Sequence, residues 1–88
     1  MEDYPLLKQA FANVLKAKRE ELNLSKLRLA QMAKLERVYL IQLEKGDKRP
    51  TVNALFYLST AFGLKPSEML SMVEKEIERL KRGEPGGD

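Results

Sequence analysis

The 88-residue chain contains no histidine, no cysteine and no tryptophan. Without histidine, it lacks the side chain that most often serves as a general base and as a metal ligand. Without cysteine, it has neither a disulfide framework nor a thiolate metal site. Its serines have no histidine to activate them, and no glycine-rich phosphate loop accompanies them. We therefore expect no enzyme, no cofactor and no metal site.

Long apolar segments are also missing. No run approaches the length of about 18 apolar residues that a membrane span requires. The N-terminus lacks the order of basic and then apolar residues that marks a signal peptide. The sequence therefore indicates a soluble, cytoplasmic protein without a membrane partner, and its length suits one small domain with a single core.

The net charge of +3 is distributed unevenly. Residues 1–24 carry four basic and four acidic groups, net 0, whereas residues 25–50 carry seven basic and three acidic groups, net +4. Residues 67–88 carry four basic and six acidic groups, net −2. The positive excess lies in the middle third of the chain, where a polyanion is expected to dock. A solvated charged loop would give the same count.

The spacing of apolar residues predicts helices and no strands. Period-2 alternation and Asn-Gly or Asp-Gly hairpin turns are missing, whereas apolar residues recur three or four apart between capping signals. The predicted helices are residues 5–22, 26–33, 36–45, 51–62 and 67–82. The chain is thus predicted to be all-α, a five-helix bundle. Residues 1–66 form its core, the fifth helix closes it, and residues 83–88 are a disordered tail.

Particular residues mark the ends of these helices. Ser25, Thr51 and Ser67 stand where the side chain of an N-cap would accept a backbone hydrogen bond. Gly46 and Gly63 stand where a left-handed residue ends a helix. Each of these five predicted boundaries therefore has a local physical cause.

The two short helices, 26–33 and 36–45, are joined by about three residues. Two helices that cross at a steep angle need a small side chain at the crossing and apolar side chains around it. Ala30 supplies the small side chain. The surrounding apolar residues are Leu29, Ala33, Leu35, Leu40 and Leu43. This spacing is the helix-turn-helix pattern.

From Phe11 to about Leu70 the chain resembles the Cro/repressor type, or XRE family, of DNA-binding proteins. The stretches that carry the resemblance are KAKREELNLSKLRLAQMA, LIQLEKGDKRPTVNAL and LSTAFGLKPSEML. The string LEKG…P over residues 43–50 is the more specific part, because it follows the two-helix pattern. The resemblance implies a phage-repressor fold that binds duplex DNA. The segment ERVYL, residues 36–40, is also similar to restriction–modification controller proteins.

Two positions depart from the family's pattern. The family often begins the second helix with a Gln that binds a DNA phosphate, whereas this chain has Lys26. A lysine also neutralises a phosphate and donates to it, so the contact is still expected. The family often has Gly in the turn, where this chain has Lys34. A positive φ at Lys34 would store about 1 kcal/mol of strain.

Helix 36–45 carries more apolar residues than one core face uses. At about 100° per residue, Leu40 and Leu43 point into the core. In this fold the opposite face enters the major groove, where Arg pairs with guanine, Gln with adenine and apolar side chains with thymine methyls. The expected base contacts are Arg37, Val38, Ile41 and Gln42. As alternatives, Val38 and Ile41 would cover another helix or a dimer interface, and Arg37 would contact a phosphate or water.

Phosphate contacts are expected from basic and hydroxyl side chains around the motif and from helix N-termini. The residues are Ser25, Lys26, Tyr39, Lys45, Lys48, Arg49 and Thr51. Tyr39 fits the rim of the core equally well, and Lys48 and Arg49 also suit a solvated loop. The resemblance further implies a structural ion pair between Arg19 and Glu44, which would tie the first helix to the third.

An apolar seam follows the fifth helix at spacings of 3, 4 and 3. Its residues are Leu70, Val73, Ile77 and Leu80. Because this helix needs only its first turn to close the core, we expect the seam to form a homodimer that reads two half-sites of duplex DNA. In the alternative arrangement, the fifth helix folds back onto the first and leaves a monomer.

These features predict a sequence-specific transcriptional regulator that binds double-stranded DNA. The alternative is a protein-interaction module of the same fold, an antitoxin or a partner of another regulator. Salt dependence separates the two, because phosphate contacts weaken steeply with added salt whereas apolar contacts hardly respond.

Overall fold

The structure, a computed structural model, describes residues 1–83. This part of the chain contains five helices and no strand. The helices are α1 (Leu7–Glu21), α2 (Lys26–Met32), α3 (Arg37–Glu44), α4 (Val52–Ala61) and α5 (Pro66–Lys81). The prediction of an all-α five-helix fold is confirmed. Most of the predicted tail, residues 84–88, lies outside the described residues.

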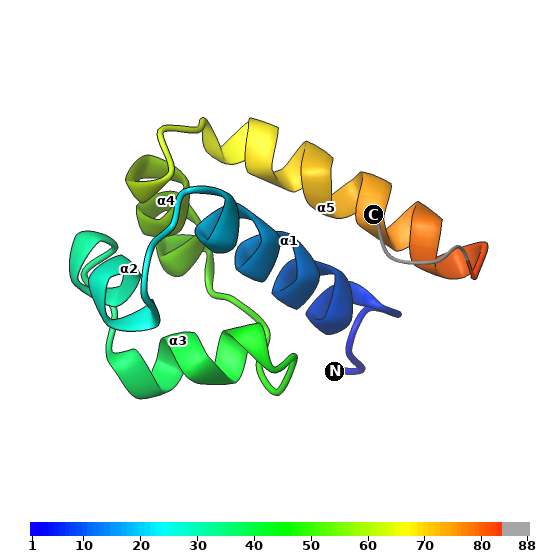
Figure 1. The fold of residues 1–88 in the computed structure, drawn as a ribbon. Helices are drawn as coiled ribbons and strands as arrows, with labels where there is room; N and C mark the ends of the chain where they lie inside the picture. The colour runs from blue at the N-terminus through cyan, green and yellow to red at the C-terminus, as the bar shows by residue number, and fades with distance from the viewer. Residues whose placement is uncertain (84–88) are drawn as a thin grey trace.

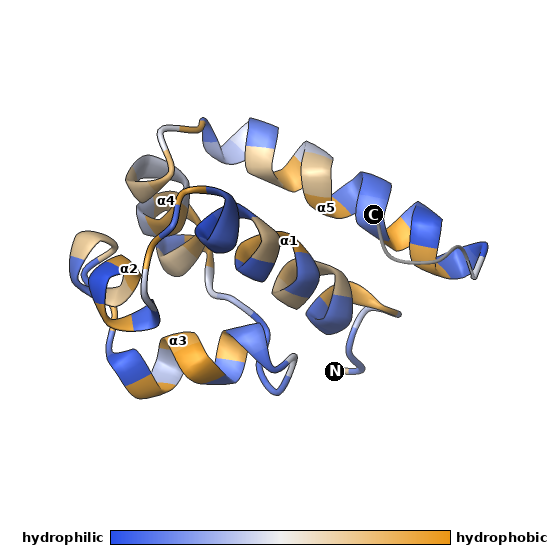
Figure 2. Cartoon of the chain, viewed as in Figure 1, coloured by the Kyte–Doolittle hydropathy of each residue, from blue (hydrophilic) through white to orange (hydrophobic). Residues whose placement is uncertain are grey.

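Helix α1 lies at the centre of the molecule (Figure 1). It packs against α5 on one side and against α3 on the other, while α2 and α4 lie together near its C-terminal end. Hydrophobic and hydrophilic residues alternate along α1, α3 and α5 (Figure 2), as expected of helices with one face toward a core. The side chains at the centre of the core, Phe11, Leu15, Leu29, Leu40, Leu43 and Leu58, are at most 2% exposed.

Most helix boundaries follow from the local signals in the sequence. Ser25 accepts a hydrogen bond from the backbone N–H of Arg28, and Thr51 accepts one from that of Ala54, both at 3.0 Å. Both predicted N-caps are therefore present. Gly46 ends α3 with a φ of 76°, a conformation that costs glycine little because it has no Cβ.

Two predicted boundaries are wrong. Helix α1 begins at Leu7 rather than Pro5, because Leu6 has a φ of 66° and the Leu7 N–H closes a turn onto the Tyr4 carbonyl at 3.1 Å. Helix α5 begins at Pro66 with Lys65 as its N-cap residue, so Ser67 is not the cap.

The start of α5 has a simple physical reason. Proline has a helical φ and no N–H, which suits the first position of a helix. The carboxylate of Glu68 then accepts the Lys65 backbone N–H at 2.7 Å. Pro66 and Glu68 therefore stabilise the first turn of α5 without a hydrogen bond from Ser67.

The expectation that only the first turn of α5 closes the core is also wrong. Val73 and Ile77 are 2% and 8% exposed, and α5 runs alongside α1 (Figure 1). The Asn13 side chain of α1 donates to the Glu76 carboxylate of α5 at 2.7 Å. Helix α5 folds back because α1 has apolar residues on two faces, one for α3 and one for α5. Val73 and Ile77 are therefore core residues.

None of the helices among residues 1–83 is both long and apolar enough to cross a membrane.

Candidate nucleic-acid interface

The turn between α2 and α3 sets the angle at which α3 is presented. Lys34 has a φ of 55°, so it adopts the left-handed conformation that a glycine would take more readily. The Leu35 N–H then donates to the Ala30 carbonyl at 2.9 Å, which closes the end of α2. Ala30 and Ala33 are at most 2% exposed at the crossing. The small side chains allow the close approach that the motif requires.

Helix α3 has one fully buried face and one outward face. Leu40 and Leu43 are fully buried. Val38 is 64% exposed, and Arg37 is also exposed. Ile41 and Gln42 are half-buried. The four expected base-contact residues therefore lie together along the side of α3 that the core does not use, at positions i, i+1, i+4 and i+5.

A buried ion pair anchors the C-terminal end of α3. Arg19 Nε lies 2.6 Å from Glu44 Oε2, and Arg19 Nη2 lies 3.1 Å from Glu44 Oε1. The side chains are only 11% and 4% exposed. Arg19 Nη1 also donates to the Leu24 carbonyl at 2.8 Å, so one guanidinium joins α1, α3 and the loop before α2. The hydrogen bond to Glu44 raises the pKa of Arg19.

This is the pair that the resemblance implies. Its burial makes it structural, because neither group is open to a phosphate. The pair fixes the position of the C-terminal end of α3 relative to α1, and therefore the orientation of the outward face of α3.

Tyr39 links α3 to the start of α4. It is half-buried and packs against the core. Its hydroxyl accepts the backbone N–H of Thr51 at 3.2 Å. The Thr51 amide is therefore already bonded, whereas the Tyr39 and Thr51 hydroxyls each keep a proton that could be donated to a phosphate. Tyr39 thus lies at the rim of the core, and its contact with a phosphate stays a prediction.

The basic residues expected to contact phosphates differ in whether they already form ion pairs within the protein. Lys26, Lys45 and Lys48 are exposed, and none makes an ion pair with another residue among 1–83. Arg49 is different, since its Nε lies 3.2 Å from Asp3 Oδ1. The other oxygen of Asp3 lies 2.9 Å from Lys8 Nζ.

The carboxylate of Asp3 is thus held between two cations. The hydrogen bond from Lys8, with the charge of Arg49 adding to it, keeps the pKa of Asp3 below its ordinary value. Asp3 was missed in the sequence, because no local pattern connects the N-terminal segment to the loop before α4. A phosphate that binds Arg49 competes with this carboxylate for the guanidinium.

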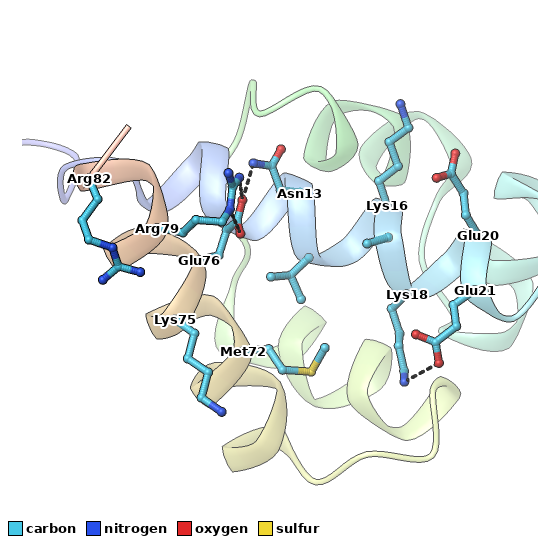
Figure 3. A pocket seen from close by; sticks show the side chains of 12 residues that line it. Asn13, Lys16, Lys18, Glu20, Glu21, Met72, Lys75, Glu76, Arg79 and Arg82 are labelled. Carbon is cyan, nitrogen blue, oxygen red and sulfur yellow. Dashed lines mark hydrogen bonds and ion pairs between the residues drawn. The ribbon is translucent and has the colours of Figure 1, made fainter. Parts of the chain in front are cut away.

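A concave region lies between α1 and α5, on the side of α1 away from α3. A cleft of about 790 Å³ runs between α1 and α5, and Figure 3 shows the charged side chains along it. Many of these charges are paired within the cleft: Glu76 accepts from Asn13 and Arg79, and Lys18 pairs with Glu21. The mixture of signs makes this cleft a poor match for a polyanion. The candidate interface is the surface formed by α2, α3 and the following loop.

Two short helices that cross at a tight turn, the second with its outer face unoccupied, define a helix-turn-helix protein. A family model described as Helix-turn-helix matches residues 15–69. The chain belongs to this family, in its Cro/repressor (XRE) type, which comprises DNA-binding transcription regulators. The resemblance inferred from the sequence is confirmed.

Solved structures of one regulator share the fold. The chain is similar to two crystal structures of the clp gene regulator ClgR from Corynebacterium glutamicum. The first has a TM-score of 0.82 at 22% identity, covering 92% of this chain and 86% of that one. The second has a TM-score of 0.74 at 23% identity, covering 88% and 99%. No curated protein sequence matches this chain significantly.

Proposed function

We propose that the protein is a sequence-specific transcriptional regulator that binds double-stranded DNA as a homodimer, with α3 in the major groove. The outward face of α3 carries this proposal. Val38 is an apolar side chain left 64% exposed, although the same helix has two leucines fully buried. Thymine methyls in the major groove are a suitable apolar partner, while Arg37 and Gln42 bring donors for guanine and adenine edges.

Phosphate contacts position the helix on the duplex. Lys26 at the start of α2 and Lys45 and Lys48 after α3 supply free positive charge around the base-reading face. The hydroxyls of Ser25 and Thr51 lie at the N-termini of α2 and α4, which favour anions. Arg49 joins this set when it leaves Asp3. Such contacts hold the register and carry no sequence information.

The small number of base pairs that one helix-turn-helix unit can contact supports the homodimer. One helix-turn-helix unit reads few base pairs, and proteins of this class gain specificity from two half-sites about one helical turn apart. The α5 seam supports the dimer less than the sequence suggested, because Val73 and Ile77 are buried within the monomer. Of its four residues, Leu70 is 46% exposed and Leu80 is half-buried against the core.

The decisive experiment is selection of bound sequences from random duplex DNA. The expected result is a motif with two-fold symmetry whose half-sites are about one helical turn apart. Recovery of DNA without any enriched motif would contradict sequence-specific binding. An enriched motif without symmetry would contradict the dimer alone.

The second candidate function is a non-enzymatic protein-interaction module of the same fold, such as an antitoxin or a partner of another regulator. The exposed aromatic Tyr57, 39% exposed on α4, favours it. Binding to such a partner would change little between low and high salt, whereas binding to DNA would weaken steeply.

A further inference from the structure

Two positive side chains from separate segments of the chain converge on one carboxylate. Lys8 lies in the first turn of α1, and Arg49 lies in the loop between α3 and α4. Lys8 Nζ is 2.9 Å from Asp3 Oδ2, and Arg49 Nε is 3.2 Å from Asp3 Oδ1. Each oxygen of this carboxylate therefore faces its own cation, and a single anion holds the two cations together.

The loop after α3 packs against the start of α1. A Cβ added to Gly46 would lie 3.5 Å from Oε1 of Gln9 and 3.7 Å from the carbonyl oxygen of Lys8. Figure 1 shows the N-terminal segment beside this loop, at the C-terminal end of α3. Lys8 therefore lies next to the loop that carries Lys48 and Arg49, although no local pattern in the sequence places it there.

We propose that Lys8 and Arg49 together form a binding site for one phosphate of the DNA backbone, and that Asp3 occupies this site in the free protein. Like a phosphodiester, a carboxylate spreads one negative charge over two oxygens on one centre. Asp3 Oδ1 and Oδ2 therefore stand in for the two non-bridging oxygens of a phosphate, which lysine and arginine bind in the same way. The proposal rests on the proposed function and adds to it a contact from α1.

The charge at this site favours an external polyanion. Two cations face one carboxylate, so Asp3 leaves one positive charge uncompensated. The nearest acidic residue in the loop, Asp47, is exposed and makes no ion pair with any described residue. A duplex carries one negative charge for about every 1.7 Å of its axis. It therefore offers more negative charge to the two cations than Asp3 does alone.

The segment that carries Asp3 is lightly held. Residues 1–6 are all exposed, so none of them is anchored in the core. The Leu7 N–H closes a turn onto the Tyr4 carbonyl at 3.1 Å, and Leu6 has a φ of 66°, a conformation that strains a residue other than glycine. A phosphate can therefore replace the carboxylate of Asp3 without disturbing the packing of the helices.

The test is a double-mutant cycle of Lys8→Gln and Arg49→Gln, measured as affinity for duplex DNA at fixed salt. All variants also carry Asp3→Asn, so that displacement of Asp3 does not differ between them. Lys8→Gln should lower the affinity about five-fold for every sequence, the effect of one exposed charge pair. Because both side chains hold the same phosphate, the loss in the double variant should fall short of the product of the single losses by more than about two-fold.

Lys16→Gln is the matched control. Lys16 is an exposed lysine of α1 that lines the cleft toward α5 and makes no ion pair with any residue among 1–83. The side chains of Lys8 and Arg49 are 37% and 49% exposed, so all variants should fold, as circular dichroism would verify. Equal losses for Lys8→Gln and Lys16→Gln, or a double variant whose loss equals the product of the single losses, would overturn the proposal.

Two further results identify the source of the phosphate and separate this proposal from the proposed function. Inorganic phosphate at millimolar concentration and constant ionic strength should not saturate the NMR shifts of Lys8 and Arg49 in Asp3→Asn. Saturation would assign the site to a free phosphate compound and overturn the contact with DNA. If the unchanged chain binds no duplex, the proposed function fails together with this site. If the chain binds duplex DNA and Lys8→Gln binds it equally well, only this site fails.

Discussion

The guanidinium of Arg19 and the carboxylate of Glu44 meet through two hydrogen bonds, of 2.6 and 3.1 Å, in a site where both side chains are nearly buried. The pair joins the C-terminal end of α3 to α1. The position of α3, the helix proposed to read DNA, therefore depends on a contact that lies within the protein.

Removing one partner of this pair should strongly destabilise the fold. Arg19→Ala leaves the Glu44 charge buried without compensation, a change that costs about 3–5 kcal/mol. Urea unfolding measures the loss. Lys18→Ala removes an exposed pair with Glu21 and is expected to cost at most about 1 kcal/mol. If Arg19→Ala and Lys18→Ala have equal effects, the pair does not hold α3 in place.

Arg37 should determine preference at one base pair. Arg37→Ala is expected to weaken specific binding by about 1–3 kcal/mol and to relax the preference for guanine at that position. Arg37→Lys keeps the charge but lacks the planar fork. It should therefore lose base preference while keeping non-specific affinity. Fluorescence anisotropy with single-base variants of the selected site measures both. Unchanged preference in both variants would remove Arg37 from the base contacts.

Lys48 should contribute to affinity without contributing to specificity. Lys48→Ala is expected to weaken binding to all sequences equally and to lower the slope of log K against log salt by about 0.9, the value for one phosphate contact. The control is Lys75→Ala, which removes an exposed lysine from α5, on the far side of α1 from α3. Equal slopes for Lys48→Ala and the unchanged chain would show that Lys48 touches no phosphate.

Asp3 should compete with DNA for Arg49. Asp3→Asn releases the guanidinium, so DNA affinity should rise for all sequences and the salt slope should steepen by about 0.9. Glu2→Gln makes the same change in charge at a neighbouring exposed residue that has no ion pair within residues 1–83. An equal gain in both variants would attribute the effect to net charge, and no gain would mean that Asp3 does not compete with DNA for Arg49.

Glu76 should make the stability of the fold depend on acid. Hydrogen bonds from Arg79 and then Asn13 hold the pKa of Glu76 below its ordinary value of 4.5. A carboxyl group with a lowered pKa in the folded state stabilises the fold above its ordinary pKa, and this contribution is lost as the pH falls through the lowered one. Urea unfolding of Glu76→Gln should therefore show a smaller loss of stability below about pH 4.5 than the unchanged chain.

The matched control for Glu76 is Glu74→Gln, an exposed glutamate on the same helix. It should keep the acid sensitivity of the unchanged chain. The same pH dependence in Glu76→Gln and the unchanged chain would mean that the ionised carboxylate of Glu76 does not stabilise the fold.

The sequence by itself determined the five helices, the helix-turn-helix motif and the family. These features depend on apolar periodicity, on caps such as Ser25 and Thr51 and on a small residue, Ala30, at the crossing, all of which act within a few residues of the chain. The outward face of α3 could be predicted for the same reason, because burial of Leu40 and Leu43 leaves their neighbours on the opposite side.

Only the tertiary structure decided which helix faces and which side chains pack against one another. The apolar spacing of Val73 and Ile77 is the same whether the partner is α1 or a second subunit, so periodicity could not choose between them. The pairing of Arg49 with Asp3, and the exposure of Phe56 beside a buried Leu55, likewise depend on how distant segments approach. Burial is a property of the packed chain, and it is packing that separates a core seam on α5 from an open apolar face on α4.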